Sequence, residues 1–105
     1  MPIIQAASGV VTQINVFTVP EGGQEAMLAN LARGVEVARE TPGWLSASLH
    51  RSFDGSRIVN YAQSESMEAA LAVIARLKAA GMIGRNRDFG EAHPGLYEVI
   101  QTFGR

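Results

Sequence analysis

The chain has 105 residues, a formal net charge of −1 at pH 7 and no cysteine, which limits it to one small domain. The missing cysteines exclude disulfides, thiolate catalysis and thiolate metal sites, and the lack of excess positive charge argues against a nucleic-acid partner. No run of residues is apolar enough for a membrane span, and the amino terminus lacks a basic stretch followed by an apolar run. We therefore expect a cytoplasmic protein with no membrane partner.

The first half of the chain predicts a strand, a helix and a hairpin. Val10–Val19 is rich in β-branched residues and alternates in polarity, as a strand does, and Gln24–Glu40 has apolar residues three and four positions apart, as a helix does. Trp44–Arg51 is predicted as the second strand. The turn sequence Asp54-Gly55 then predicts that Arg57–Gln63 returns antiparallel as the third strand.

The second half predicts one more helix and one more strand. Ser66 can cap a helix that ends at Gly81. The buried stripe of this helix is predicted to be Met67, Leu71, Ile74 and Leu77. Residues Met82–Gly95 are mixed, with room for a short helical turn, and Leu96–Phe103 is predicted as the last alternating strand.

The order of the predicted elements is βαββαβ, which indicates an α+β ferredoxin-like fold. Such a fold has a four-stranded antiparallel sheet with two helices on one face, and it would take up residues 1–105 as a single domain. The other face would expose apolar residues such as Val59 and Tyr61, and a domain of this size buries only about 60 to 70% of its unfolded surface. We therefore expect a homodimer in which a second copy covers this face.

Four stretches of the sequence match a pattern found in one protein family. Residues 42–52 read PGWLSASLHRS, and residues 59–66 read VNYAQSES. Residues 12–17 and 96–99 read TQINVF and LYEV. Together these stretches resemble the antibiotic biosynthesis monooxygenase family across nearly the whole chain. The resemblance implies a dimeric α+β barrel that oxidises phenolic polyketide aromatics with dioxygen, without metal, haem or flavin.

The resemblance also implies a pocket between the sheet and the helices. The family's pocket asparagine corresponds to Asn60, whose amide would hydrogen-bond a phenolate or a peroxy intermediate. The family's tryptophan four residues later is Ser64, and a tyrosine of the second helix is Ala70, so the pocket should be roomier and less polar. An arginine after the second helix corresponds to Arg85, or to Arg87 in a shifted register, and would favour the substrate anion.

Further residues complete the predicted site. The residues expected to contact the substrate are Ser64, Trp44, Ile58, Ala62 and Leu71. His50 is the predicted base, with His93 as its alternative, because an imidazole with a pKa of about 6.5 suits removal of a phenolic proton. The expected partners are an aromatic small molecule, dioxygen and a second copy of the chain, with no cofactor.

Two other functions are compatible with these residues. Ser64 and Ala70, in place of the family's aromatic residues, also suit a non-catalytic dimeric protein that binds a small molecule. A cyclase or isomerase would use His50 or His93 for proton transfer. Haem degradation is disfavoured, because relatives with that activity combine an asparagine on the first strand, here Asn15, with the tryptophan that Ser64 replaces.

Overall fold

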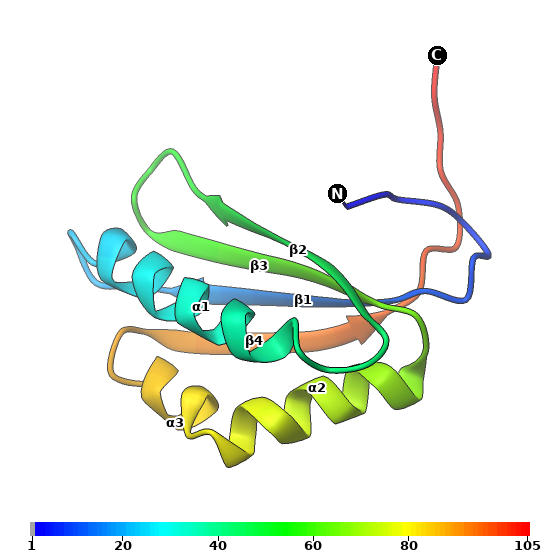
Figure 1. Ribbon diagram of the computed structural model, residues 1–105. Coiled ribbons are helices and arrows are strands. Elements are labelled where there is room, and N and C mark those ends of the chain that lie inside the picture. Colours follow the sequence, from blue (N-terminus) through cyan, green and yellow to red (C-terminus); the bar gives the residue numbers. More distant parts are fainter. Residues whose placement is uncertain (1) are drawn as a thin grey trace.

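The computed structural model describes residues 2–105, which form a four-stranded antiparallel sheet and three helices (Figure 1). In chain order the elements are β1 (Val11–Thr18), α1 (Gln24–Ala38), β2 (Trp44–Arg51), β3 (Arg57–Ser64), α2 (Met67–Ala79), α3 (Met82–Asn86) and β4 (Glu91–Tyr97). The strands lie in the order β2-β3-β1-β4, and the helices cover one face of the sheet. The predicted α+β ferredoxin-like fold is therefore confirmed.

The hairpin between β2 and β3 forms where the sequence predicts it. Gly55 adopts a φ of +82°, a left-handed conformation that glycine tolerates. Oδ1 of Asp54 accepts hydrogen bonds from Oγ and the backbone N–H of Ser56, at 2.7 and 2.9 Å, and from Oγ of Ser52 at 2.8 Å. The bonds from Ser56, followed by that from Ser52, lower the pKa of Asp54 from 3.8 to about 2, because they favour the carboxylate.

The hydrophobic core fills the end of the molecule near this hairpin. Phe17 of β1 and Ile58 of β3 contact Met27 and Leu31 of α1, and none of the four is more than 6% exposed. The residues packed around them are Val19, Leu28, Leu49 and Phe89. Burial of each large apolar side chain stabilises the fold by about 1.5–3 kcal/mol. The core therefore fixes α1 on the sheet. The space between the sheet and the helices that lies farther from the hairpin is left for the site.

Both ends of α2 lie where the sequence predicts them. Oγ of Ser66 accepts a hydrogen bond of 3.1 Å from the backbone N–H of Ala69 and so caps the first turn. At the other end Gly81 adopts a φ of +75° and separates α2 from α3. Among residues 2–105 no helix is both long and apolar enough to cross a membrane.

The buried side of α2 differs from the predicted stripe. Met67 and Leu71 are 50% and 53% exposed, so the prediction is wrong at these two positions. The residues buried instead are Ala69, Ala70 and Val73. The start of the helix lies so close to Gly43 that a Cβ atom there would be 2.6 Å from Cβ of Ala69. Small residues are required at this contact, and the larger side chains point away from it.

The last strand lies earlier in the chain than predicted. The expected strand Leu96–Phe103 is wrong, because β4 ends at Tyr97 and residues 98–105 form no strand. Pro94 and Gly95 are disfavoured inside most strands, so the sequence pattern did not indicate a strand at this position. As an edge strand, β4 tolerates Pro94, since one side of an edge strand needs no backbone donor.

Candidate functional site

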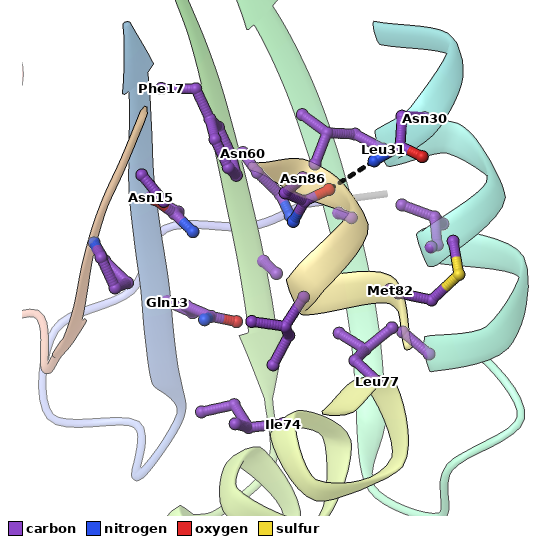
Figure 2. A pocket seen from close by; sticks show the side chains of 18 of the residues that line it. Gln13, Asn15, Phe17, Asn30, Leu31, Asn60, Ile74, Leu77, Met82 and Asn86 are labelled. Atoms are coloured by element: carbon purple, nitrogen blue, oxygen red, sulfur yellow. Dashed lines mark hydrogen bonds between the residues drawn. The ribbon is translucent and has the colours of Figure 1, made fainter. Parts of the chain in front are cut away.

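A cavity of about 570 Å³ lies between the sheet and the helices (Figure 2). All four strands line one side of it, and α1, α2 and α3 line the other. Apolar residues of the helices form much of the wall, among them Val35, Val73, Ile74, Leu77 and Ile83. Small-molecule sites in proteins have volumes of about 300–1,000 Å³, so the cavity is large enough for a compact organic ligand.

Five carboxamide side chains interrupt this apolar wall. They are Gln13, Asn15, Asn30, Asn60 and Asn86. Asn15 and Asn60 are direct partners across β1 and β3, where paired side chains on one face lie about 5 Å apart. Asn30 comes from α1 and Asn86 from α3. Polar groups from both layers therefore converge on a space that is otherwise apolar.

The amide of Asn15 has a fixed orientation. Its Oδ1 accepts a hydrogen bond of 3.1 Å from the backbone N–H of His93 on β4. The Nδ2 group is then the free end of the side chain, and Figure 2 shows it directed from β1 into the cavity. Asn15 therefore presents hydrogen-bond donors to a ligand.

Two carboxamide oxygens at the cavity have no hydrogen-bond partner. Oδ1 of Asn60 and Oδ1 of Asn30 are both buried and unpaired. The Asn30 side chain is fully buried, and its Nδ2 donates to Oδ1 of Asn86. A buried polar atom without a partner costs about 1–3 kcal/mol.

The cavity interior carries no charge. Of the residues that line it, only Arg87 and Glu91 ionise at neutral pH, and both are exposed. Within the described part of the chain, no three His, Cys, Asp or Glu residues are close enough to hold a metal ion. Ligand recognition inside the cavity therefore depends on amides and apolar contacts, with charge available only at exposed positions.

Three of the residues predicted for the site lie on the cavity wall, namely Asn60, Trp44 and Ala62. Arg85 lies outside the wall, and its Nη1 is 3.9 Å from Sδ of Met82. Arg87, the alternative to Arg85, is on the wall. The structure therefore places Arg87, the arginine of the shifted register, at the cavity.

The other predicted contacts lie elsewhere. Ile58 is fully buried in the core, and Ser64 is buried where β3 ends, opposite Val11 of β1. Leu71 is half exposed on α2, because the small residues of this helix make its contact with the rest of the fold. None of the three lines the cavity.

Both histidines lie on the open face of the sheet. His50 is opposite Val59 and His93 is opposite Val16, and strand alternation directs these pairs away from Asn60 and the cavity. Nε2 of His50 shares a hydrogen bond of 2.8 Å with Oγ of Ser48. The side chains of His50 and His93 are exposed, and neither lines the cavity.

The sequence interpretation did not single out Asn30 or Asn86. A signal for Asn30 exists, because it lies three residues after Met27 and four before Gly34, on the buried side of α1. A polar residue at a buried helical position usually has a specific partner. Asn86 has no comparable signal, since α3 is only five residues long.

Comparison with known protein families matches residues 10–75 to the family described as antibiotic biosynthesis monooxygenase. Among curated proteins, the chain is similar to the Tetracenomycin-F1 monooxygenase of Streptomyces glaucescens. The two are 31% identical over 105 residues, which cover 99% of this chain and 94% of that protein.

Two solved structures of oxygenases are also similar to this chain. The monooxygenase of the ActVA-Orf6 gene of Streptomyces coelicolor, in complex with the ligand nanaomycin D, aligns with a TM-score of 0.78 and 28% identity over 93% of each chain. The cofactor-independent oxygenase SnoaB from Streptomyces nogalater aligns with a TM-score of 0.80 and 24% identity, over 92% of this chain and 99% of that chain. The SnoaB likeness bears on the fold alone.

Proposed function

The chain belongs to the antibiotic biosynthesis monooxygenase family and is an oxidoreductase of the monooxygenase type, and we propose that it oxidises a phenolic aromatic compound with dioxygen and no cofactor. The relative named for tetracenomycin F1 supports a substrate of the polyketide type. The observation that carries the proposal is the pair of amides, Asn15 and Asn60, in an uncharged and mostly apolar cavity.

The proposed reaction needs no external reductant. An anthracenone anion is electron-rich, and it transfers an electron to dioxygen before the two radicals form a carbon–oxygen bond. Loss of water from the resulting hydroperoxide leaves a carbonyl. The ring CH₂ group loses four electrons, and dioxygen is reduced to the carbonyl oxygen and one water. The protein has only to bind the substrate, favour its anion and position the oxygen.

The cavity residues suit these tasks. The Nδ2 group of Asn15 points into the cavity and can donate to the substrate oxyanion, and Asn60 lies opposite it on β3. Arg87 supplies a positive charge that favours an anion, and Glu91 is the one carboxylate of the lining that can accept the phenolic proton. Trp44 and Ala62 would contact the rings of the substrate.

Oxygen consumption tests the proposal. Chelator-treated protein is incubated with a dihydroxyanthracenone, and dioxygen uptake and quinone formation are followed together. We expect uptake by the unmodified protein and a reduction of about 100-fold in kcat for Asn60→Ala, because one donor to the anion is lost. No uptake above the buffer rate across a panel of such phenols would contradict the proposal.

The same samples test the non-catalytic alternative, in which the cavity only binds its ligand. Tight binding of the quinone, measured by a thermal shift, together with no oxygen uptake by any variant, would favour a binding protein. A cyclase or isomerase using His50 or His93 gains no support from the structure, since both imidazoles lie on the face of the sheet that is away from the cavity.

A further inference from the structure

Gly34 lies in the middle of α1, on the side of the helix that faces the sheet. It follows Leu31 by three residues and precedes Ala38 by four, and both of these side chains are buried. Glycine destabilises a helix interior relative to alanine, because its backbone loses more conformational freedom on folding. A glycine at such a position therefore needs a reason, either in the packing of the protein or in what the protein binds.

The packing of α1 does not require a glycine at this position. The φ of Gly34 lies outside the left-handed region. Apart from the adjoining residues of α1, the only atom of residues 2–105 within 4 Å of a Cβ here would be Cδ2 of Leu77, at 3.9 Å, which is an ordinary van der Waals contact. At Gly43, by contrast, a Cβ atom would be 2.6 Å from Cβ of Ala69. Alanine would therefore fit at position 34 in the unliganded protein.

The missing side chain leaves space in the cavity opposite two alanines. Gly34 lines the cavity, as do Ala47 of β2 and Ala62 of β3, which are direct cross-strand partners. Nε2 of Gln24 donates to the carbonyl oxygen of Arg57, which places the start of α1 beside the start of β3. From there Gly34 lies about 15 Å along α1 and Ala62 about 17 Å along β3. The glycine and the two alanines therefore face each other at one level of the cavity.

We infer that a fused ring of the substrate occupies the space beside Gly34, and that this glycine sets the size of the ring system that the protein accepts. This inference rests on the proposed function and narrows its substrate class. Asn15 and Asn60 lie one inward-facing position closer to the hairpin, about 7 Å along their strands from the level of Gly34. A phenolic ring held by these amides would place its further rings beside the glycine. The preferred substrate is then a planar phenol of three or more fused rings.

Quinones of two sizes test the inference by binding alone. Calorimetry compares a hydroxynaphthoquinone, which has two fused rings, with a dihydroxyanthraquinone, which has three. We expect the unmodified protein to bind the three-ring quinone tighter by about 10-fold or more, and Gly34→Ala to lose this preference, because its methyl group takes the space of the third ring. The thermal midpoint of the unliganded variant should rise by about 4–8 °C, because alanine favours a helix. Stability and binding should therefore change in opposite directions.

Two further variants complete the test. Ala47→Leu fills the same space from the sheet, so it should also weaken the three-ring quinone and leave the two-ring quinone unaffected. Gly84→Ala is the matched control, because Gly84 lies in α3, does not line the cavity, and a Cβ atom there would meet no atom of residues 2–105 within 4 Å. This variant should keep the preference for three rings.

Three results would overturn the inference. The first is a preference for three rings that survives in Gly34→Ala and Ala47→Leu. The second is a lower thermal midpoint for Gly34→Ala, which would assign the glycine to packing. The third is an unmodified protein that does not prefer the three-ring quinone. Because the titrations require no turnover, absence of oxygen uptake would contradict the proposed function, and the binding data would still decide the role of Gly34.

Discussion

Asn15 and Asn60 are partners across β1 and β3, but their amides have different surroundings. Oδ1 of Asn15 is bonded to the backbone of His93, so turning this amide would break a hydrogen bond. Oδ1 of Asn60 has no partner, so this amide can turn and present either end to a ligand. The pair therefore combines one fixed donor with one adaptable group.

Substitution of Asn15 tests the role of the fixed donor. We expect Asn15→Ala to lower kcat by about 100-fold, as loss of a preorganised donor to an anion does. Asn15→Asp should be slower still, because a carboxylate repels the substrate anion. Oxygen uptake measures both effects, and a thermal unfolding curve checks that each variant is folded. An Asn15→Asp variant as active as the unmodified protein would exclude this role.

The sequence could identify some site residues and not others, for a physical reason. Asn60 and Ala62 could be placed on one face of a strand, because strand alternation is local. Asn30 and Asn86 are 56 residues apart, and their amides meet only after α1 and α3 have packed on the sheet. Arg85 and Arg87 differ in their access to the cavity because of the local turn of α3, whose register the sequence left open.

At the scale of the elements, the turn between β2 and β3 depends on the charge of Asp54. Three hydrogen bonds to Oδ1 lower the pKa of this exposed group from 3.8 to about 2. The stabilisation is present above pH 3.8, where the unfolded chain is also ionised, and it is lost as the pH falls toward 2.

Asp54→Asn tests this contribution. The variant cannot carry the charge, so its thermal midpoint should be below that of the unmodified protein at neutral pH. The two midpoints should approach each other as the pH falls from 4 toward 2, because the unfolded chain takes up the proton first and the folded-state carboxylate of Asp54 follows near pH 2. Calorimetric scans at several pH values measure the difference. A gap that stays constant down to pH 2 would show that the charge of Asp54 does not stabilise the turn.

The elements themselves were predictable where local signals decide them. β2 has the predicted bounds, and the hairpin follows from Asp54-Gly55. β4 was misplaced because its position depends on pairing with β1, which accepts Pro94 at an edge. The buried side of α2 was misjudged because the close approach to Gly43, a tertiary contact, requires small residues there.

At the scale of the whole molecule, the two faces of the sheet differ. The helices cover one face, while the centre of the other carries the cross-strand pairs Val16–Val59 and Ile14–Tyr61, all partly exposed. The amino-terminal segment covers part of this open face, where the amide of Gln63 bonds to the backbone of Ile3 at both its oxygen and its nitrogen. The remaining apolar surface suits a second copy of the chain, and we propose that the protein is a homodimer.

Light scattering tests the proposed homodimer. We expect a mass of about twice the 11.2 kDa of one chain, because a stable interface buries about 1,200–2,000 Å² and the open face of the sheet offers the apolar part of it. Val59→Arg should shift the protein to the monomer, since it would bury a charge. Ala75→Lys, an exposed position on α2, is the control and should remain dimeric. A monomeric mass for the unmodified protein at micromolar concentration would contradict the proposal.

In the proposed reaction, the substrate itself reduces dioxygen in the cavity that contains Asn15 and Asn60. The most direct test of this reaction is a turnover of chelator-treated protein with a dihydroxyanthracenone under ¹⁸O₂, with the quinone analysed by mass spectrometry. We expect one labelled oxygen in the new carbonyl and one in water, at a rate that depends on Asn60. Quinone without the label, or a labelled product formed equally fast by Asn60→Ala, would contradict it.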